Sequence, residues 1–322
     1  MATKKYMESV EKIRTRFEYL KKELSKVIVG QAAVVDEILV AIMCGGNALL
    51  ESYPGLGKTL MIKTLAKLLD LKFSRIQSTP DLMPSDITGT YLIEEHRGEK
   101  RFKFQKGPVF SNIVLADEIN RATPKTQAAL LEAMQERQVT VGNTTFPLDL
   151  PFFVLATQNP IDQEGTYPLP EAQVDRFIFK ILVGYPQKQE EFEIIERFTG
   201  HAIDPGLKKV FNKEQLLTIQ KLVRQVPIAD DIKQKVVTLV NFTRENKDLI
   251  EYGASPRASL GIVLAAKAHA LLGGRSYVSM KDIEAVSYPV LRHRIILSFK
   301  AERDGLNPDA VIGELLKKLW TN

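Results

Sequence analysis

The chain has 322 residues, of which 44% are hydrophobic and 26% charged. This composition is ordinary for a globular protein and excludes the disordered and fibrous classes. The net charge of +5 is small and spread along the sequence, so it does not by itself indicate a nucleic acid or membrane partner. Because Cys44 is the only cysteine, the chain can form neither an internal disulfide nor a cysteine-cluster metal site.

The length predicts two domains, at roughly 150 residues per domain. The first 26 residues are charged throughout and lack the apolar region of a secretory signal. No stretch approaches the roughly 20 apolar residues that are needed to cross a bilayer. We therefore expect a cytoplasmic protein that does not insert into a membrane.

Hydrophobic spacing in the first half of the chain alternates between helical and strand patterns. The expected helices are 8–27, 31–43, 58–69 and 124–135. The expected strands are 48–50, 73–77, 113–115, 152–156 and 179–183. Because strands that alternate with helices form parallel sheets covered on both faces, this half predicts an α/β fold.

Two segments interrupt this alternation, and each predicts an inserted β-hairpin. The first pairs 91–93 with 101–104 across a turn at 97–99, and the second pairs 138–141 with 144–146 across Gly142-Asn143. Neither alternates cleanly enough to lie in a core, so we expect both hairpins to project from the sheet.

The pattern changes after Pro186, where helical spacing continues and strand patterns almost disappear. The expected helices of this half are 190–198, 213–226, 230–246, 256–272, 281–291 and 308–319. We therefore expect an α/β core over 1–186, with an N-terminal helix and the two hairpins, and a helical domain over 187–322.

A phosphate-binding loop is predicted at Pro54-Gly55-Leu56-Gly57-Lys58-Thr59, between an expected strand and an expected helix. Its glycines let backbone N–H groups curl around phosphate oxygens, Lys58 reaches the β- and γ-phosphates, and the hydroxyl of Thr59 holds Mg²⁺. The usual pattern has glycine where this chain has Ser52. The alternative, an ordinary glycine turn, does not explain the strand–loop–helix context.

Acidic and amide side chains follow two further strands. At the carboxyl edge of a sheet, Asp117 can hold the Mg²⁺ shell while Glu118 orients and deprotonates the attacking water. Asn159 follows the fourth strand and can hold that water or the γ-phosphate. Taken alone, the acidic pair also fits a solvated helix start, and Asn-Pro also fits an ordinary turn.

Two arginines complete the candidate site. Arg176 is a candidate arginine finger for the nucleotide of a neighbouring subunit, although spacing alone favours a local pair with Asp175 or Glu171. Arg257 lies in a first helical turn, where a cation opposes the helix dipole, and this indicates a task such as phosphate contact. The run Arg292-His293-Arg294 is interpreted as a solvated helix face.

These motifs, in this order, resemble AAA+ ATPases and, more specifically, the MoxR family. The matching strings are VIVGQ at 27–31, the loop at 54–59, LMPSDITG at 82–89, ADEINRA at 116–122, LEAMQE at 131–136, ATQNP at 156–160, LPEAQ at 169–173, DRF at 175–177 and GASPR at 253–257. The resemblance runs from about 27 to 294, which is nearly the whole chain.

The resemblance implies an α/β P-loop AAA+ core with a parallel sheet flanked by helices, a smaller all-α lid, and ATP and Mg²⁺ bound between them. The residues implied to contact ATP are Val29, Gly30, Gln31, Pro54, Gly55, Leu56, Gly57, Lys58, Thr59, Leu60 and Arg257. Those implied to act in catalysis are Lys58, Glu118, Asn159 and Arg176, and those implied to hold Mg²⁺ are Thr59 and Asp117.

The family also implies an assembly and a task. Arg176 would complete a neighbour's site, which requires a homo-oligomeric ring, expected to be a hexamer, whereas Arg257 would act either in cis or in trans. The ring would carry out chaperone-like remodelling or maturation of a protein client, with a separate von Willebrand factor A-domain protein as a further partner.

Two other interpretations stay open. The pI near 9.0 and the projecting hairpins suggest a nucleic-acid-stimulated motor, but the segment 139–146 carries no Lys or Arg and therefore no aromatic–basic interleaving. Nucleic acid is therefore not the expected partner. Ser52 suggests a nucleotide-gated scaffold with little turnover.

Overall fold

A five-stranded parallel sheet forms the centre of the N-terminal half. The computed structural model describes residues 2–96, 99–161, 165–200 and 205–321. The strands of this sheet are β1 (Ala48–Ser52), β2 (Phe73–Gln77), β5 (Ile113–Asp117), β8 (Phe153–Gln158) and β9 (Phe179–Val183). Their order is β2-β5-β8-β1-β9, and all neighbours pair in parallel, which confirms the predicted α/β core.

The sheet is covered on both faces, because alternate residues of each strand enter two different cores. Ile113 and Leu115 pack with one group of helices, and Val114 and Ala116 pack with another. The first group is α1 (Ala2–Leu24), α2 (Ala32–Cys44) and α3 (Lys58–Leu68), and the second contains α5 (Pro124–Glu136) and the short α4 (Pro84–Thr88). Two-sided burial explains why β5 is apolar almost throughout.

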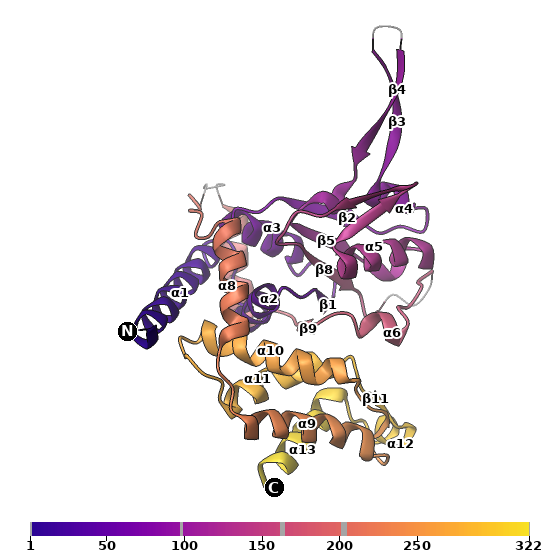
Figure 1. The fold of residues 1–322 in the computed structure, drawn as a ribbon. Coiled ribbons are helices and arrows are strands. Elements are labelled where there is room, and N and C mark those ends of the chain that lie inside the picture. Colours follow the sequence, from indigo (N-terminus) through magenta and orange to yellow (C-terminus); the bar gives the residue numbers. More distant parts are fainter. Residues whose placement is uncertain (1, 97–98, 162–164, 201–204, 322) are drawn as a thin grey trace.

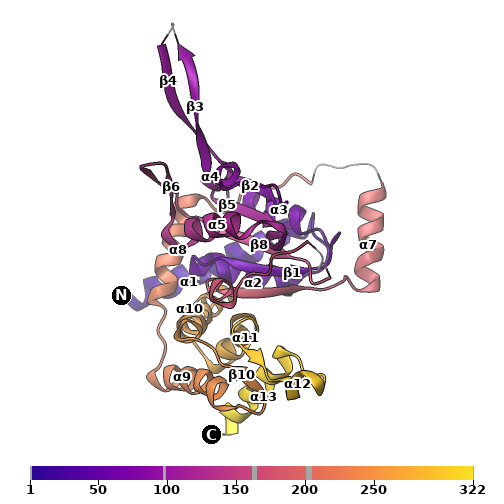
Figure 2. The same ribbon diagram turned by 90° about the vertical axis from the view of Figure 1, so that its right-hand side faces the viewer.

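Both predicted hairpins project from this core (Figures 1 and 2). The first consists of β3 (Gly89–His96) and β4 (Glu99–Lys106), and residues 97–98 of its expected turn at 97–99 lie outside the described residues. The second consists of β6 (Gln138–Val141) and β7 (Thr144–Pro147). Stacking of Phe104 on Phe146, with ring centroids 4.2 Å apart, joins the bases of the two hairpins.

The C-terminal half is helical. Its helices are α7 (Lys188–Thr199), α8 (Lys213–Gln225), α9 (Asp230–Glu245), α10 (Pro256–Leu272), α11 (Met280–Leu291), α12 (Phe299–Arg303) and α13 (Pro308–Thr321). In Figure 2, α7 stands at the side of the core, while α9 to α13 form the lid below it. The lid also contains a small antiparallel ribbon of β10 (Ile250–Tyr252) and β11 (Ile296–Leu297), which is too short to produce a periodic signal.

The remaining elements are short turns that lead into and out of the sheet. They are the 3₁₀ turns η1 (Pro108–Phe110) and η2 (Ile119–Arg121) and the helix α6 (Glu171–Val174). Within the described ranges, no helix combines the length and the apolar character that crossing a membrane requires.

Candidate active site

The loop between β1 and α3 has the backbone that its glycines permit. Gly55 and Gly57 have φ values of +81° and +73°, in the left-handed region that other residues adopt only with strain. A Cβ at either position would meet no atom within 4 Å, so backbone conformation, not crowding, requires the glycines. The loop leads into the N-terminus of α3, where backbone N–H groups and the helix dipole favour an anion.

Lys58 lies across the start of this loop. Its Nζ donates to the carbonyl oxygens of Ser52, at 3.3 Å, and Tyr53, at 3.1 Å. Burial lowers the pKa of Lys58, while the nearby charges of Asp117 and Glu118 act in the opposite direction. Ser52 itself is buried and donates its hydroxyl to the carbonyl of Tyr53, at 2.9 Å, so the serine is accommodated at the end of β1.

Asp117 and Glu118 are joined by one buried hydroxyl from the neighbouring strand. Thr157 in β8 donates its Oγ1 to Asp117 Oδ1, at 2.6 Å, and accepts the backbone N–H of Glu118, at 2.9 Å. Glu118 has φ 55° and ψ 50°, a left-handed conformation that is strained for glutamate. The bond to Thr157 therefore helps to hold the strained residue, which turns the chain directly after the strand.

Arginine side chains accompany both carboxylates. Arg75 Nη2 lies 2.6 Å from Asp117 Oδ2, and Arg121 Nε lies 3.0 Å from Glu118 Oε2. Asp117 is nearly buried, so this pairing with Arg75 offsets the cost of placing its charge there.

Asn159 lies at the same edge of the sheet, one residue beyond β8. It lines a polar pocket of about 370 Å³ together with Glu51, Gln158 and Asn120, whose Oδ1 is buried without a hydrogen-bond partner within the described structure. Lys58, Thr59, Asp117, Glu118 and Asn159 therefore all lie at the carboxyl edge of the sheet, as predicted.

A second, mainly apolar pocket of about 240 Å³ lies beside the loop. It is lined by Val27, Ile28, Val29, Gln31, Gly55, Leu56, Gly57, Leu60, Pro186, Ile194 and Phe198. Gln31 Nε2 donates to the carbonyl of Leu56, at 3.2 Å, whereas Gln31 Oε1 is buried and has no partner in the described residues.

Not every residue predicted to contact the nucleotide lines this apolar pocket. Gly30 instead lies against α7, where a Cβ would come within 2.4 Å of Glu190 Oε1. Pro54 is exposed in the loop, and Thr59 is half-buried as the second residue of α3.

Arg176 lies at the opposite edge of the sheet. It precedes β9, whose first residue, Phe179, pairs with Ala48 at the start of β1, while the phosphate-binding loop follows the end of β1. The five residues of β1 separate the two edges by about 16 Å, at about 3.3 Å per residue. The arginine therefore lies outside the neighbourhood of its own chain's loop.

The side chain of Arg176 is exposed, and within the described part of the chain it forms no hydrogen bond or ion pair. The local alternative, a pair with Asp175 or Glu171, is therefore wrong. Asp175 is occupied by other groups, and these come from the lid.

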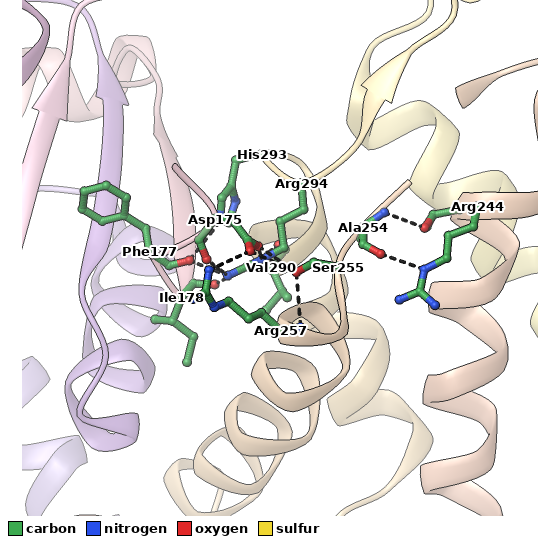
Figure 3. Close-up of polar contacts among 11 residues, drawn as sticks. Asp175, Phe177, Ile178, Arg244, Ala254, Ser255, Arg257, Val290, His293 and Arg294 are labelled. Carbon is green, nitrogen blue, oxygen red and sulfur yellow. Dashed lines mark hydrogen bonds and ion pairs between the residues drawn. The ribbon is translucent and has the colours of Figure 1, made fainter. Parts of the chain in front are cut away.

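Figure 3 shows the polar cluster around Asp175. Arg257 Nη1 lies 3.2 Å from Asp175 Oδ2, Ser255 donates its hydroxyl to the same oxygen at 3.0 Å, and Arg294 Nε lies 2.8 Å from Asp175 Oδ1. The carboxylate of Asp175 explains why the positive charge of Arg257 is tolerated in the first turn of α10. It also places Arg257 at the amino edge of the sheet, beside the segment that carries Arg176.

The interpretation of Arg292-His293-Arg294 as a solvated face is wrong. The side chain of Arg294 is 3% exposed and that of Arg292 is 9% exposed. His293 Nε2 lies 3.0 Å from the carbonyl oxygen of Phe177, and burial holds the pKa of this imidazole well below 6.5. The run follows the end of α11, where the lid docks under β9, so its side chains enter the contact between lid and core.

The sequence did not predict the contacts of four residues that organise the site. They are Arg75, Thr157, Asp175 and Arg294. Thr157 and Asp175 lie within the strings ATQNP and DRF that carry the family resemblance, and this is the one signal that could have indicated their roles. Arg75 and Arg294 carry no local signal, because their partners are 42 and 119 residues away along the chain.

Comparison with known proteins agrees with this architecture. Residues 47–179 match the model of the ATPase family associated with various cellular activities, and residues 243–315 match the model of the AAA lid domain. The chain is 46% identical to Chaperone MoxR1 of Mycobacterium tuberculosis over 303 residues, which cover 92% of this chain and 79% of that protein. The chain belongs to the MoxR family of AAA+ ATPases.

Further relatives match this chain along almost its entire length. The uncharacterized protein YeaC of Bacillus subtilis is 44% identical over 91% of both chains. A crystal structure of a presumed ATPase from Cytophaga hutchinsonii superposes with a TM-score of 0.92 at 45% identity, covering 99% of this chain and 98% of that one. The MoxR fold thus extends over both the sheet-containing core and the lid.

Proposed function

We propose that this MoxR-family chain is a Mg²⁺-dependent ATPase whose sites are shared between neighbouring copies in a ring. The observation that carries the proposal is the separation of the phosphate-binding loop from Arg176 and Arg257, at opposite edges of one sheet. A head-to-tail ring brings different faces of identical copies together, so the amino edge of one copy can meet the carboxyl edge of the next. On this proposal both arginines act in trans.

The nucleotide is proposed to span the two pockets beside the loop. Its phosphates lie on Gly55–Thr59 with Lys58 as counter-charge, and its base enters the apolar pocket lined by Val29, Leu56 and Leu60. Gln31 Oε1 has no hydrogen-bond partner among the described residues, which supports this placement, because a buried acceptor requires a donor and the exocyclic amine of adenine supplies one.

Thr59 and Asp117 are proposed to hold Mg²⁺. A hydroxyl and a carboxylate are the oxygen ligands that this ion prefers, and both residues lie at the carboxyl edge beside Lys58. When bound, the ion would neutralise charge on the β- and γ-phosphates.

Hydrolysis then depends on the side chains of two copies. Glu118 accepts a proton from the attacking water, and Asn159 orients that water toward the γ-phosphate. Arg176 and Arg257 of the neighbouring copy approach the phosphates and stabilise the charge that develops in the transition state.

The task of the ring is proposed from the relatives. Because a 46% identical relative is named a chaperone, we infer that hydrolysis drives remodelling or maturation of a protein client by a ring, most simply a hexamer. A separate von Willebrand factor A-domain protein is the further partner that we propose.

The test mixes two inactive variants. Arg176→Ala is expected to lower turnover by about 10³-fold or more without dispersing the oligomer, and Lys58→Ala is expected to be inactive. An equal mixture is expected to recover about a quarter of wild-type activity, since about one site in four then combines an intact loop with intact neighbouring arginines. Steady-state hydrolysis and light scattering are measured on the same samples.

Arg303→Ala is the matched control, because Arg303 is exposed and, within the described structure, forms an ion pair with the neighbouring Asp304. It should turn over ATP at the wild-type rate. If Arg176→Ala keeps its activity, or if the mixture stays inactive while large oligomers persist, the shared-site ring is wrong.

A further inference from the structure

A buried arginine of the lid holds the backbone on both sides of Arg176. Arg294 donates to the carbonyl oxygens of Asp175, at 3.1 Å, Phe177, at 2.5 Å, and Ile178, at 3.1 Å. These carbonyls belong to the residue before the proposed finger and to the two residues after it. One side chain from the lid therefore fixes the path of the core segment that carries Arg176.

The charge of Arg294 needs Asp175. Arg294 is almost entirely buried, and its Nε lies 2.8 Å from Asp175 Oδ1. Burial lowers the pKa of Arg294, whereas the hydrogen bond and charge of Asp175 raise it. A buried cation without such a partner is strongly destabilising. Asp175 is therefore needed for Arg294 to stay bound to the backbone carbonyls on both sides of Arg176.

The second oxygen of the same carboxylate reaches the first turn of α10. Ser255 donates its Oγ to Asp175 Oδ2, at 3.0 Å, and accepts the backbone N–H of Arg257, at 3.2 Å. Arg257 Nη1 lies 3.2 Å from Asp175 Oδ2, although its side chain is 55% exposed. Asp175 thus ties the first turn of α10 to the segment that carries Arg176 (Figure 3). The side chains of Arg176 and Arg257 are both exposed.

We propose that Asp175 and Arg294 are a positioning pair, which locks Arg176 of the core and Arg257 of the lid into one unit for presentation to the nucleotide of a neighbouring copy. This inference rests on the proposed function, in which the two arginines act in trans. Movement of the lid relative to the core would break this pair and misplace the two arginines relative to each other, so docking of the lid would control hydrolysis in the neighbour.

The experiment compares Asp175→Asn with Asp309→Asn. Asp309 is a matched control, because it pairs with Arg292, another largely buried arginine of the same run, at 3.0 Å through both oxygens. Arg292 also bonds to the core, through the carbonyl of Lys180 in β9 at 3.0 Å, but away from the finger segment. Both variants remove one carboxylate charge from the contact between lid and core.

Asp175→Asn is expected to lower kcat by about 10²-fold with little change in KM for ATP, because its own nucleotide site is intact and only the arginines it presents are misplaced. Asp309→Asn is expected to keep the wild-type kcat, even where its melting temperature falls as much. An equal mixture of Asp175→Asn with Lys58→Ala is expected to recover about a quarter of wild-type activity, since Lys58→Ala copies present an intact pair.

A second variant covers the case in which Asp175→Asn does not fold. Ser255→Ala leaves the pair of Asp175 and Arg294 in place and removes the hydroxyl that ties it to α10. It is expected to lower kcat several-fold, with the same recovery in the mixture.

Two outcomes would overturn the inference. One is an equal loss of kcat in Asp175→Asn and Asp309→Asn, which would show a purely structural role. The other is an inactive mixture of Asp175→Asn with Lys58→Ala while the mixture of Arg176→Ala with Lys58→Ala recovers. If neither mixture recovers, the proposed function fails, and the inference fails with it.

Discussion

The two edges of the central sheet are built in different ways. At the carboxyl edge, adjacent parallel strands bring Asp117 and Thr157 together, and the loop after β1 brings Lys58 beside them. At the amino edge, Arg176 and Arg257 lie near each other only because the lid docks on the core through Asp175 and Arg294. The residues at the carboxyl edge are therefore brought together by the sheet itself, whereas those at the amino edge are brought together by the contact between lid and core.

The difference between the two edges agrees with the separate chemical tasks that we propose for them. The carboxyl edge holds strained and buried groups, such as Glu118 in a left-handed conformation, whose positions leave little freedom. At the amino edge, the exposed side chains of Arg176 and Arg257 lie beside the buried contact of Asp175 with Arg294. The first arrangement suits a fixed site for hydrolysis, and the second suits an element that another copy receives.

The largest effect is expected at the carboxyl edge. Glu118→Gln keeps the size of the side chain but removes the proposed base, so hydrolysis should fall by about 10²–10⁴-fold while ATP binding persists. Steady-state turnover and equilibrium binding of a fluorescent ATP analogue measure the two properties. Glu132→Gln, on the exposed face of α5, is the control and should match the wild type. Unchanged turnover in Glu118→Gln would remove this residue from the mechanism.

A smaller effect is expected where the strands join the two carboxylates. Thr157→Val preserves shape but removes the hydroxyl that bridges Asp117 Oδ1 and the N–H of Glu118. We expect a loss of about 1–3 kcal/mol in the free energy of unfolding, because two buried polar groups lose a partner. Turnover should fall as well, without rescue by Lys58→Ala copies, since both variants are then defective in the site that receives the arginines. Urea unfolding and the mixing assay test this, and rescue would argue against it.

The smallest effect on hydrolysis is expected at Glu37, a half-buried residue of α2 near Arg292 and Asp309. Burial raises its pKa from 4.5 to about 7, with Arg292 acting in the opposite direction. Between these pH values the folded state keeps a proton that the unfolded state has lost, so stability falls as pH rises through this window. Glu37→Gln removes this loss and should raise the free energy of unfolding by about 1–2 kcal/mol at pH 8.

The same variant should be no more stable than the wild type at about pH 3.5, below both pKa values, where Glu37 holds its proton in the folded and in the unfolded state. Its ATP turnover at pH 8 should be unchanged, because the residue lies at neither edge. Urea unfolding at the two pH values is the measurement. An equal gain at both would show that packing, not protonation, causes the change.

Much of the fold is readable from the sequence, because the signals are local. The spacing predicts Phe73–Gln77, Phe179–Val183 and Pro256–Leu272 with the bounds that the structure has. The first two are strand-length runs between turn signals, and the third begins with a Ser-Pro cap. By contrast, β10 and β11 escape prediction, since two or three residues carry no period.

The sequence does not predict in the same way which charged residues are exposed and which are buried. Nothing local distinguishes Arg294, which is buried, from Arg176, which is exposed, and the interpretation of the Arg292–Arg294 run failed for this reason. An arginine becomes buried when a carboxylate and free carbonyls lie opposite it, and here those groups belong to a segment more than 100 residues earlier.

The sequence by itself predicted the phosphate-binding loop, the two strands that lead to Asp117 and to Asn159, and the membership of the MoxR family. These depend on backbone conformations and neighbouring residues that lie within one short segment. Only the tertiary structure decided that Arg176 and Arg257 lie at the edge opposite the loop and that Asp175 and Arg294 hold them there. The physical reason is that strand direction and lid docking, which no single segment encodes, decide which charges meet.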